Sequence, residues 1–288
     1  MEKFYGMSND YLFKAVMQEQ DDVLRNLLCA LLNLQEEDVV TCKIENPIRL
    51  GESVGDKECI LDIKLLLNGN KNINVELQIK KDDDWPERSL LYWARSYDDI
   101  KAGESYRNLK PTYHIGIIDF PLYEGDDELY SEYRILDVEN HRIYTEKFGI
   151  YVLNLSNVDN PKNADKQVVK WARIFKAKTL KELEEIAGEE EAFKKMVLEI
   201  RKLSKDEKVK QQMAARADYD SRMATARDAG KSEGIEIGMQ QGIQQGKELG
   251  EDSIIMSALA NGRSPESIAE FIDISIEKVM QVQAKMNK

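Results

Sequence analysis

The sequence predicts an α/β domain over residues 1–160, followed by an all-helical C-terminal region. Apolar residues recur at helical spacing over residues 10–34, and short apolar runs separated by Gly, Asn and Asp occupy residues 46–80. The strand pattern ends near residue 160. A chain of 288 residues with 42% hydrophobic content can also bury a sizeable core. The predicted order of the core is helix, three strands, helix, strand, followed by further short strands up to residue 160 and by helices after it.

Local patterns predict the first elements of the domain. Residues 10–34 predict one broken helix or two consecutive helices, with Ser8 or Asn9 as the N-terminal cap. The loop over residues 68–72 reads Asn-Gly-Asn-Lys-Asn, which accepts positive φ angles, so the strands that flank it are expected to form a hairpin. The three predicted strands cover residues 47–50, 58–67 and 73–80.

A second helix and further strands complete the predicted α/β domain. Pro86 suits the first turn of a helix, and the apolar pattern after it predicts a helix that ends near Gly103. A strand over residues 112–120 follows the helix. Shorter strands are predicted over residues 133–138, 142–148 and 150–155.

Three helical regions make up the rest of the chain: an extension (161–229), a glycine-repeat segment (230–250) and a tail (251–288). Residues 194–231 carry more Lys and Arg than Asp and Glu, which is typical of a solvated helix but would also suit a phosphate backbone. Helices are predicted over residues 165–178, 180–187 and 189–203, and a long polar helix from residue 205 onward.

A glycine recurs at every fourth position of the glycine-repeat segment. Each glycine inside a helix costs about 1 kcal/mol relative to alanine, so a helix here requires close packing to offset the sum. The intervening residues are too polar for a lipid-facing helix, which leaves a soluble helix bundle or a flexible linker. We therefore expect a homo-oligomer formed through the C-terminal helices. The glycines are Gly230, Gly234, Gly238, Gly242, Gly246 and Gly250.

The tail predicts two short helices in an arrangement that resembles a helix-turn-helix. Ser264 and Pro265 form a typical helix start. Acidic residues outnumber basic ones over residues 251–288, which disfavours a module that reads DNA. We therefore expect the tail to serve protein interaction or oligomerisation.

Composition and missing motifs exclude several classes of function. The net charge of −12 argues against nonspecific coating of nucleic acid, although a locally basic cleft is compatible with it. Three cysteines without a C-x-x-C pair predict no disulfide framework and fit a reducing cytoplasm. We find no signal peptide pattern and no apolar run long enough for a membrane span, so a soluble cytoplasmic protein is expected. Motifs for nucleotide cofactors are absent, and His114 and His141 lack zinc-site spacing.

Carboxylates interrupt two of the predicted strands. Strand alternation places Glu76, Gln78 and Lys80 on one face, and the hairpin places Asp62 on the paired strand. Because an unpaired buried carboxylate is costly, a divalent cation would explain these residues. Asp62, Glu76 and the Leu77 carbonyl oxygen would suffice as ligands for Mg²⁺. Alternatively, the sheet has one wet face on which these side chains meet solvent.

Several segments, in order, resemble one known family. Leu61-Asp62-Ile63, a hairpin, and Val75-Glu76-Leu77-Gln78 are similar to the D…E-x-K/Q signature of PD-(D/E)XK nucleases. More narrowly, residues 8–14, 87–95 and 109–120 resemble the recombination-promoting nuclease (Rpn) family, which also carries a transposase label. The resemblance covers roughly the first half of the chain.

The resemblance implies a PD-(D/E)XK restriction-endonuclease-like core and a metal-dependent DNA endonuclease linked to recombination, mobile elements or defence. It makes Asp62 and Glu76 the metal ligands, with Mg²⁺ or Mn²⁺ as the cation and DNA as the partner. Gln78 takes the position of the usual catalytic lysine; it can orient water or phosphate but cannot donate positive charge. Lys80 has a side chain long enough to reach the phosphate.

The helix after Pro86 carries a polar stripe and an apolar face on opposite sides. The stripe would suit a DNA backbone. The spacing of Arg88 and Tyr92 is similar to a Q-x-x-x-Y element that accompanies the metal site in some of these nucleases, and an ordinary surface pair explains it equally well. The stripe consists of Arg88, Tyr92, Arg95 and Asp99, and the opposite face includes Leu90, Ala94 and Tyr97.

Two hypotheses follow. In the first, the protein is a Mg²⁺-dependent DNA endonuclease, in which Asp62 and Glu76 bind the metal and Gln78 orients the water. Arg88 and Tyr92 then help to position the DNA strand. In the second, the protein is catalytically weak or inactive and keeps the nuclease fold as a DNA-binding or assembly module.

Overall fold

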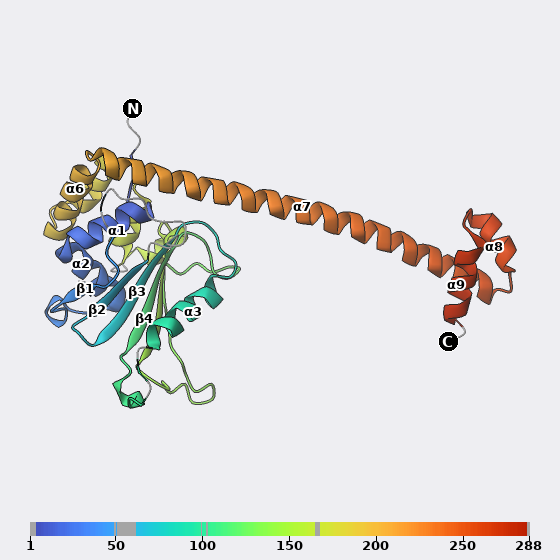
Figure 1. The fold of residues 1–288 in the computed structure, drawn as a ribbon, viewed down its shortest axis with the longest axis horizontal. Helices are drawn as coiled ribbons and strands as arrows, with labels where there is room; N and C mark the ends of the chain where they lie inside the picture. The colour runs from blue at the N-terminus through green and yellow to red at the C-terminus, as the bar shows by residue number, and fades with distance from the viewer. Residues whose placement is uncertain are drawn as a thin grey trace. The chain divides into compact units, whose positions relative to one another are not determined.

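A computed structural model describes residues 4–48, 50, 62–98, 100–101, 103–164 and 168–286 (Figure 1). The chain divides into two compact units, residues 1–221 and residues 222–288. In its described part, the first unit contains a six-stranded sheet with helices on both faces. The second unit is helical.

Two consecutive helices open the chain, as the sequence predicts. Helix α1 (Asp10–Glu19) is capped by Asn9, whose side chain accepts a hydrogen bond from the backbone N–H of Leu12. Helix α2 (Asp21–Leu32) ends at Asn33, which adopts the left-handed conformation with φ of 52°. Helix α2 buries an apolar stripe in the larger core, whereas residues 10–17 of α1 are all buried.

The predicted hairpin is present. Strand β2 (Ile63–Leu67) pairs antiparallel with β3 (Lys71–Gln78), with Ile63 opposite Val75. The turn uses positive φ angles at Asn68 and Gly69. Of the predicted strand over residues 58–67, residues 58–61 lie outside the described residues.

The strand predicted over residues 47–50 is wrong for the residues that the structure describes there. The Gln18 side chain donates to the Ile48 carbonyl and accepts from the Ile48 N–H, so a helix side chain takes the place of a neighbouring strand. The strand that pairs with β2 is β1 (Cys42–Ile44). With only three residues, β1 is too short to show the alternation of apolar and polar residues that would reveal a strand in the sequence.

The sheet has the order β1-β2-β3-β4-β6-β5, in which β3, β4 (Thr112–Ile118) and β6 (Phe148–Asn154) run parallel. Helix α3 (Trp85–Tyr97) connects β3 to β4 and lies against them (Figure 1). It ends earlier than the predicted limit near Gly103. Strand β5 (Tyr130–Tyr133) forms the far edge.

Most of the two strands predicted over residues 133–138 and 142–148 is absent. Tyr133 ends β5, Phe148 begins β6, and one isolated bridge joins Leu136 to Ile143. Between them, the Asp137 carboxylate accepts hydrogen bonds from the backbone N–H of Glu139 and from Arg142. This side-chain network closes the turn over residues 138–140, which lies mainly between the two predicted strands. The prediction over residues 150–155 matches β6, which begins slightly earlier.

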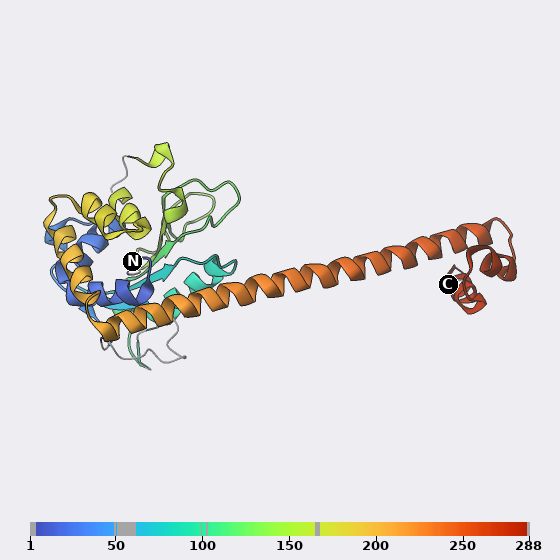
Figure 2. The same ribbon diagram turned by 90° about the horizontal axis from the view of Figure 1, so that it is seen from above.

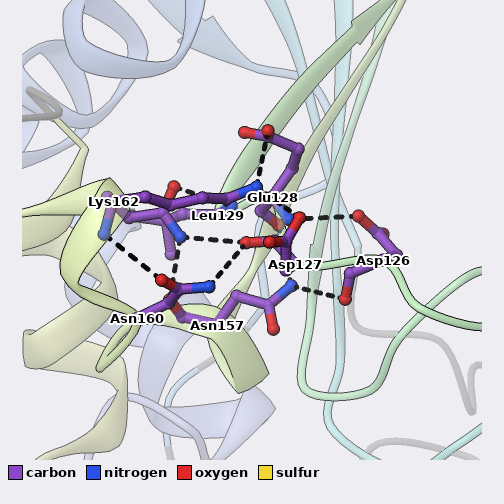
Figure 3. Close-up of polar contacts among 8 residues, drawn as sticks. Asp126, Asp127, Glu128, Leu129, Asn157, Asn160 and Lys162 are labelled. Carbon is purple, nitrogen blue, oxygen red and sulfur yellow. Dashed lines mark hydrogen bonds and ion pairs between the residues drawn. The ribbon is translucent and has the colours of Figure 1, made fainter.

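A polar network joins the loop before β5 to the segment after β6 (Figure 3). The Asn157 amide donates to the carbonyl oxygens of Asp126 and Glu128, and Lys162 pairs with Asp127 and Glu128. The contacts satisfy main-chain groups of the loop and hold β5 beside β6. The network is therefore structural in character.

The sheet separates two apolar clusters. The larger one packs Ile73 and Val75 of β3 against helices that include α1, α2, α4 (Val169–Lys176) and α6 (Glu191–Leu203). The smaller one centres on Trp85 of α3 and covers the opposite face. Alternation along β3 therefore turns Asn74 and Glu76 toward α3.

The remaining helices largely follow the prediction. Helix α5 spans Leu180–Ala187, and α6 begins two residues after its predicted start. Residues 165–167 of the predicted helix before them lie outside the described residues. Helix α7 (Glu207–Ala260) is long and polar, and its start lies beside α1 (Figure 2), where Arg216 Nε is 2.6 Å from Asp10 Oδ2.

The second unit contains the rest of α7 with α8 (Pro265–Ile272) and α9 (Ile276–Met286). Ser264 caps α8, as predicted. The small core consists of Ile255, Ile268, Val279 and Val282. The glycine-repeat segment is helical, and a Cβ atom added at any of its six glycines meets nothing within 4 Å among the described residues. No described helix has the length and apolarity needed to cross a membrane.

Candidate active site

Glu76 is a buried carboxylate in the middle of a polar cluster. Its side chain is only 3% exposed, and it points from β3 toward α3. Arg88 Nη2, on the first turns of α3, lies 2.7 Å from Glu76 Oε1. The ion pair joins the strand to the helix that crosses it, and it compensates part of the cost of burying the charge.

Gln78 is held by the same arginine. Arg88 Nη2 donates to Gln78 Oε1 over 2.9 Å, and Gln78 Nε2 donates to the Lys80 carbonyl oxygen over 2.8 Å. Arg88 Nη1 lies 2.5 Å from Asp82 Oδ2. The guanidinium group thus fixes the position of three side chains at the end of β3.

Asp62 lies one residue before β2, and continuing the hairpin register by one residue places it opposite Glu76. Its carbonyl oxygen accepts hydrogen bonds from Lys14 Nζ at 2.9 Å and Asn46 Nδ2 at 3.0 Å. Burial raises the pKa of the Asp62 carboxyl, with a further contribution from the negative charge of Glu76 and partial offset by Lys64 and Lys14. Both carboxylates are therefore desolvated and close enough to repel each other.

Tyr92 lies one turn after Arg88, beside the two carboxylates. Burial raises its pKa, and the negative charges of Glu76 and Asp62 act in the same direction. Lys80 is exposed and lies beyond the end of β3, and Leu77 turns its side chain into the larger core. The structure thus gathers Asp62, Glu76 and Gln78 with Arg88 and Tyr92 around one point, with Lys80 at its rim.

The predicted orientation of the helix after Pro86 is wrong for its first turns, whereas Arg95 is exposed and Tyr97 is partly buried against Trp93, as predicted. Leu90 is 50% exposed and Ala94 is also exposed, whereas Arg88 and Tyr92 of the polar stripe face the sheet. The reason is that this face of the sheet carries Glu76 and other polar groups, which need polar partners from the helix. Asp99 of the stripe lies outside the described residues.

Two buried residues of the cluster escaped the sequence reasoning. Lys14 is only 4% exposed. The sequence offers two local signals for it, which are a charged residue within the apolar pattern of α1 and its place in the family-like segment over residues 8–14. His114 of β4 is fully buried and its Nε2 lies 3.4 Å from Glu76 Oε2. Its proximity arises from the parallel pairing of β3 and β4, and no local pattern reveals that pairing.

Several buried polar atoms in this cluster have no hydrogen-bond partner within the described chain, among them Glu76 Oε2 and His114 Nε2. Such atoms are rare in native interiors and often mark the place of a water, ion or ligand. The described residues include no group of three His, Cys, Asp or Glu side chains placed to hold a metal. Two carboxylates with backbone oxygen nevertheless fit a hard cation that keeps several waters, as Mg²⁺ does.

Comparison with known proteins gives one finding. A family model described as PD-(D/E)XK nuclease family transposase matches residues 7–228. Comparisons with curated proteins and with solved structures each gave no match. The matched region contains the whole sheet and every residue of the polar cluster.

Proposed function

The chain belongs to the PD-(D/E)XK nuclease family transposases, and from this premise we propose that it is a metal-dependent endonuclease that hydrolyses phosphodiester bonds in DNA. One observation supports the proposal most directly. Two desolvated carboxylates, Asp62 and Glu76, meet across the β2–β3 hairpin, and one oxygen of Glu76 lacks a hydrogen-bond partner in the described residues.

Asp62, Glu76 and the Leu77 carbonyl would hold the cation, Mg²⁺ or Mn²⁺. A bound cation of this kind supplies Lewis acidity, which favours hydroxide formation and stabilises charge on the phosphate. Arg88 pairs with Glu76 Oε1, and Oε2, which His114 Nε2 faces at 3.4 Å without a hydrogen bond, stays available to the cation. Glu76 can therefore pair with Arg88 through Oε1 and bind the cation through Oε2 at the same time.

Gln78 orients the attacking water in this proposal. Its amide is already fixed by Arg88 and by the Lys80 carbonyl, which leaves one N–H and one lone pair for the water. Arg88 also brings a permanent positive charge to within hydrogen-bond distance of Gln78. We propose that this charge replaces the one that a lysine at position 78 would supply.

Tyr92 and the exposed Lys80 would contact the DNA backbone at the edge of the cluster. We further propose a cytoplasmic protein that acts in recombination, mobile-element or defence processes. A homo-oligomer through the C-terminal helices is supported by the open glycines of α7 and by its exposed apolar side chains, including Ile235, Met239 and Leu249.

A second function is a catalytically weak or inactive DNA-binding or assembly protein. The observation that favours it is the Arg88–Glu76 ion pair, which stabilises the buried carboxylate without any cation. The two functions differ in whether the protein binds a divalent metal at all.

Nicking of supercoiled plasmid by the full chain, with Mg²⁺ or Mn²⁺ and with EDTA, tests the proposal. We expect cation-dependent nicking that Asp62→Asn and Glu76→Gln abolish. Asp98→Asn and Glu87→Gln change exposed carboxylates on α3 and its end, and should cleave normally. Equal nicking by wild type and Asp62→Asn would indicate a contaminating nuclease and would refute the assignment.

A further inference from the structure

His114 lies beside Glu76 at the centre of the sheet, on the neighbouring parallel strand. Its side chain is fully buried. Its Nδ1 lies 3.1 Å from Asn74 Nδ2, and its Nε2 lies 3.4 Å from Glu76 Oε2. The ring packs between two aromatic side chains of α3, with centroid distances of 5.9 Å to Trp85 and 6.3 Å to Tyr92. Each ring nitrogen of His114 thus has a polar neighbour, and two aromatic rings of α3 lie close to the imidazole.

The contacts with Asn74 and Glu76 favour one position for the proton of a neutral His114 ring. With the Asn74 amide in this orientation, its nitrogen donates to Nδ1, and a neutral ring then carries its hydrogen on Nε2. This tautomer directs an N–H group toward Glu76 Oε2. The other tautomer would place a lone pair against a carboxylate oxygen, which is electrostatically unfavourable.

The two oxygens of Glu76 therefore have different neighbours. Arg88 binds Oε1 from α3, and His114 faces Oε2 from β4. At 3.4 Å the second contact is too long for a normal hydrogen bond, which agrees with the absence of a hydrogen-bond partner for either atom among the described residues. It is an electrostatic contact that restricts how the carboxylate can rotate.

We propose that His114, oriented by Asn74, is a positioning residue that holds the Glu76 carboxylate in the plane required for cation binding. The inference rests on the proposed metal-dependent function. Residues that contact a metal-binding side chain, but not the metal, commonly fix the orientation of that side chain. Their removal lowers metal affinity about 10- to 100-fold. Simple packing would not require two buried polar side chains, Asn74 and His114, side by side in the apolar interior of the sheet.

A matched pair of variants at position 114 tests the proposal. His114→Gln places an amide near the former Nε2 position and keeps a donor toward Glu76. His114→Asn ends near the former Nδ1 position and keeps a polar group toward Asn74 only. We expect Mn²⁺ affinity, measured by calorimetry on the full chain, to stay within about threefold in the Gln variant and to fall at least about tenfold in the Asn variant.

Equal affinity of the Asn variant and wild type, or equal losses in both variants, would overturn the proposal. Thermal unfolding of each variant without metal separates lost positioning from lost folding. If wild type itself binds no Mn²⁺, the metal-dependent function fails, and a measurement without metal decides the role of His114.

That measurement is the imidazole ¹⁵N spectrum of the full chain. We expect the Nε2–H tautomer in wild type and a changed His114 resonance in Glu76→Gln, because the charge that faces Nε2 is removed. Asn74→Leu should reduce the preference for this tautomer. A wild-type Nδ1–H tautomer, or a His114 resonance unaffected by Glu76→Gln, would show that His114 does not position Glu76.

Discussion

Arg88 Nη2 lies 2.7 Å from Glu76 Oε1, so the helix that connects β3 to β4 places a permanent positive charge on the most buried carboxylate of the sheet. The same nitrogen reaches Gln78, at the position where this superfamily commonly has lysine. Arg88 thus stabilises the buried charge of Glu76 and also holds Gln78, the residue that we propose orients the attacking water.

Replacing Arg88 with Met should destabilise the protein by about 3 kcal/mol, because it leaves a buried carboxylate without its partner. The double variant Arg88→Met with Glu76→Gln should recover part of this loss, since the uncompensated charge is then gone. Urea denaturation of the two single variants, the double variant and wild type gives the coupling energy. If the losses of unfolding free energy in the two single variants simply add up in the double variant, the Arg88–Glu76 ion pair has no coupling energy, and the prediction is wrong.

Mn²⁺ should stabilise wild type by roughly 2.7 kcal/mol at a free concentration about 100 times Kd. Asp62→Asn should lose this effect. Without metal, however, Asp62→Asn should unfold at a higher temperature than wild type near pH 7, because burial raises the pKa of this carboxyl and so penalises its charged form. Calorimetric scans with Mn²⁺ and with EDTA check both parts, and Asp98→Asn serves as the control. A metal-free Asp62→Asn that melts lower would contradict the second part.

Asp10 should make stability depend on pH in the mildly acidic range. Burial raises its pKa to about 6, although Arg216 lowers it and Asp220 adds to the increase. Because the folded pKa exceeds the unfolded one, the contribution of Asp10 is complete below about pH 4 and is lost as the pH rises through about 6. Asp10→Asn should remove that dependence and stabilise the protein at pH 7. Melting temperatures between pH 4 and pH 7.5 test this, and parallel curves for variant and wild type would refute it.

Gly116→Ala should destabilise the first unit by about 1–3 kcal/mol through overpacking. A Cβ atom at this position would lie 2.1 Å from Trp85, so α3 must move away from β4. The shift should also displace Arg88 and reduce cleavage. Urea denaturation and plasmid nicking measure the two effects. Unchanged stability would mean that Trp85 can move aside without cost.

Gly242→Ala should strengthen α7 by about 1 kcal/mol in a monomer, because nothing in the described chain lies within 4 Å of the added methyl group. If the glycines pack closely in a homo-oligomer, the same methyl group weakens assembly. Light scattering over a range of concentrations should therefore show a lower oligomer mass for Gly242→Ala than for wild type. An unchanged mass would argue against assembly through these glycines.

Much of the candidate site follows from local sequence. The turn residues Asn68 and Gly69 determine the hairpin, and the hairpin register brings Asp62 opposite Glu76. The α/β fold class and the family resemblance are likewise confirmed. These features depend on residues that are close in sequence, where side-chain alternation and turn chemistry act directly.

The folded structure sets which residues surround the two carboxylates. It turned Arg88 and Tyr92 inward and exposed Leu90, the reverse of the apolar pattern, because a polar face of the sheet requires polar partners. It also placed His114 beside Glu76 through parallel pairing across a helical crossover. Local sequence was enough to predict the two carboxylates and the hairpin that joins them. Their partners come from the packing of α3 and β4, because those contacts depend on how whole elements meet and not on local spacing.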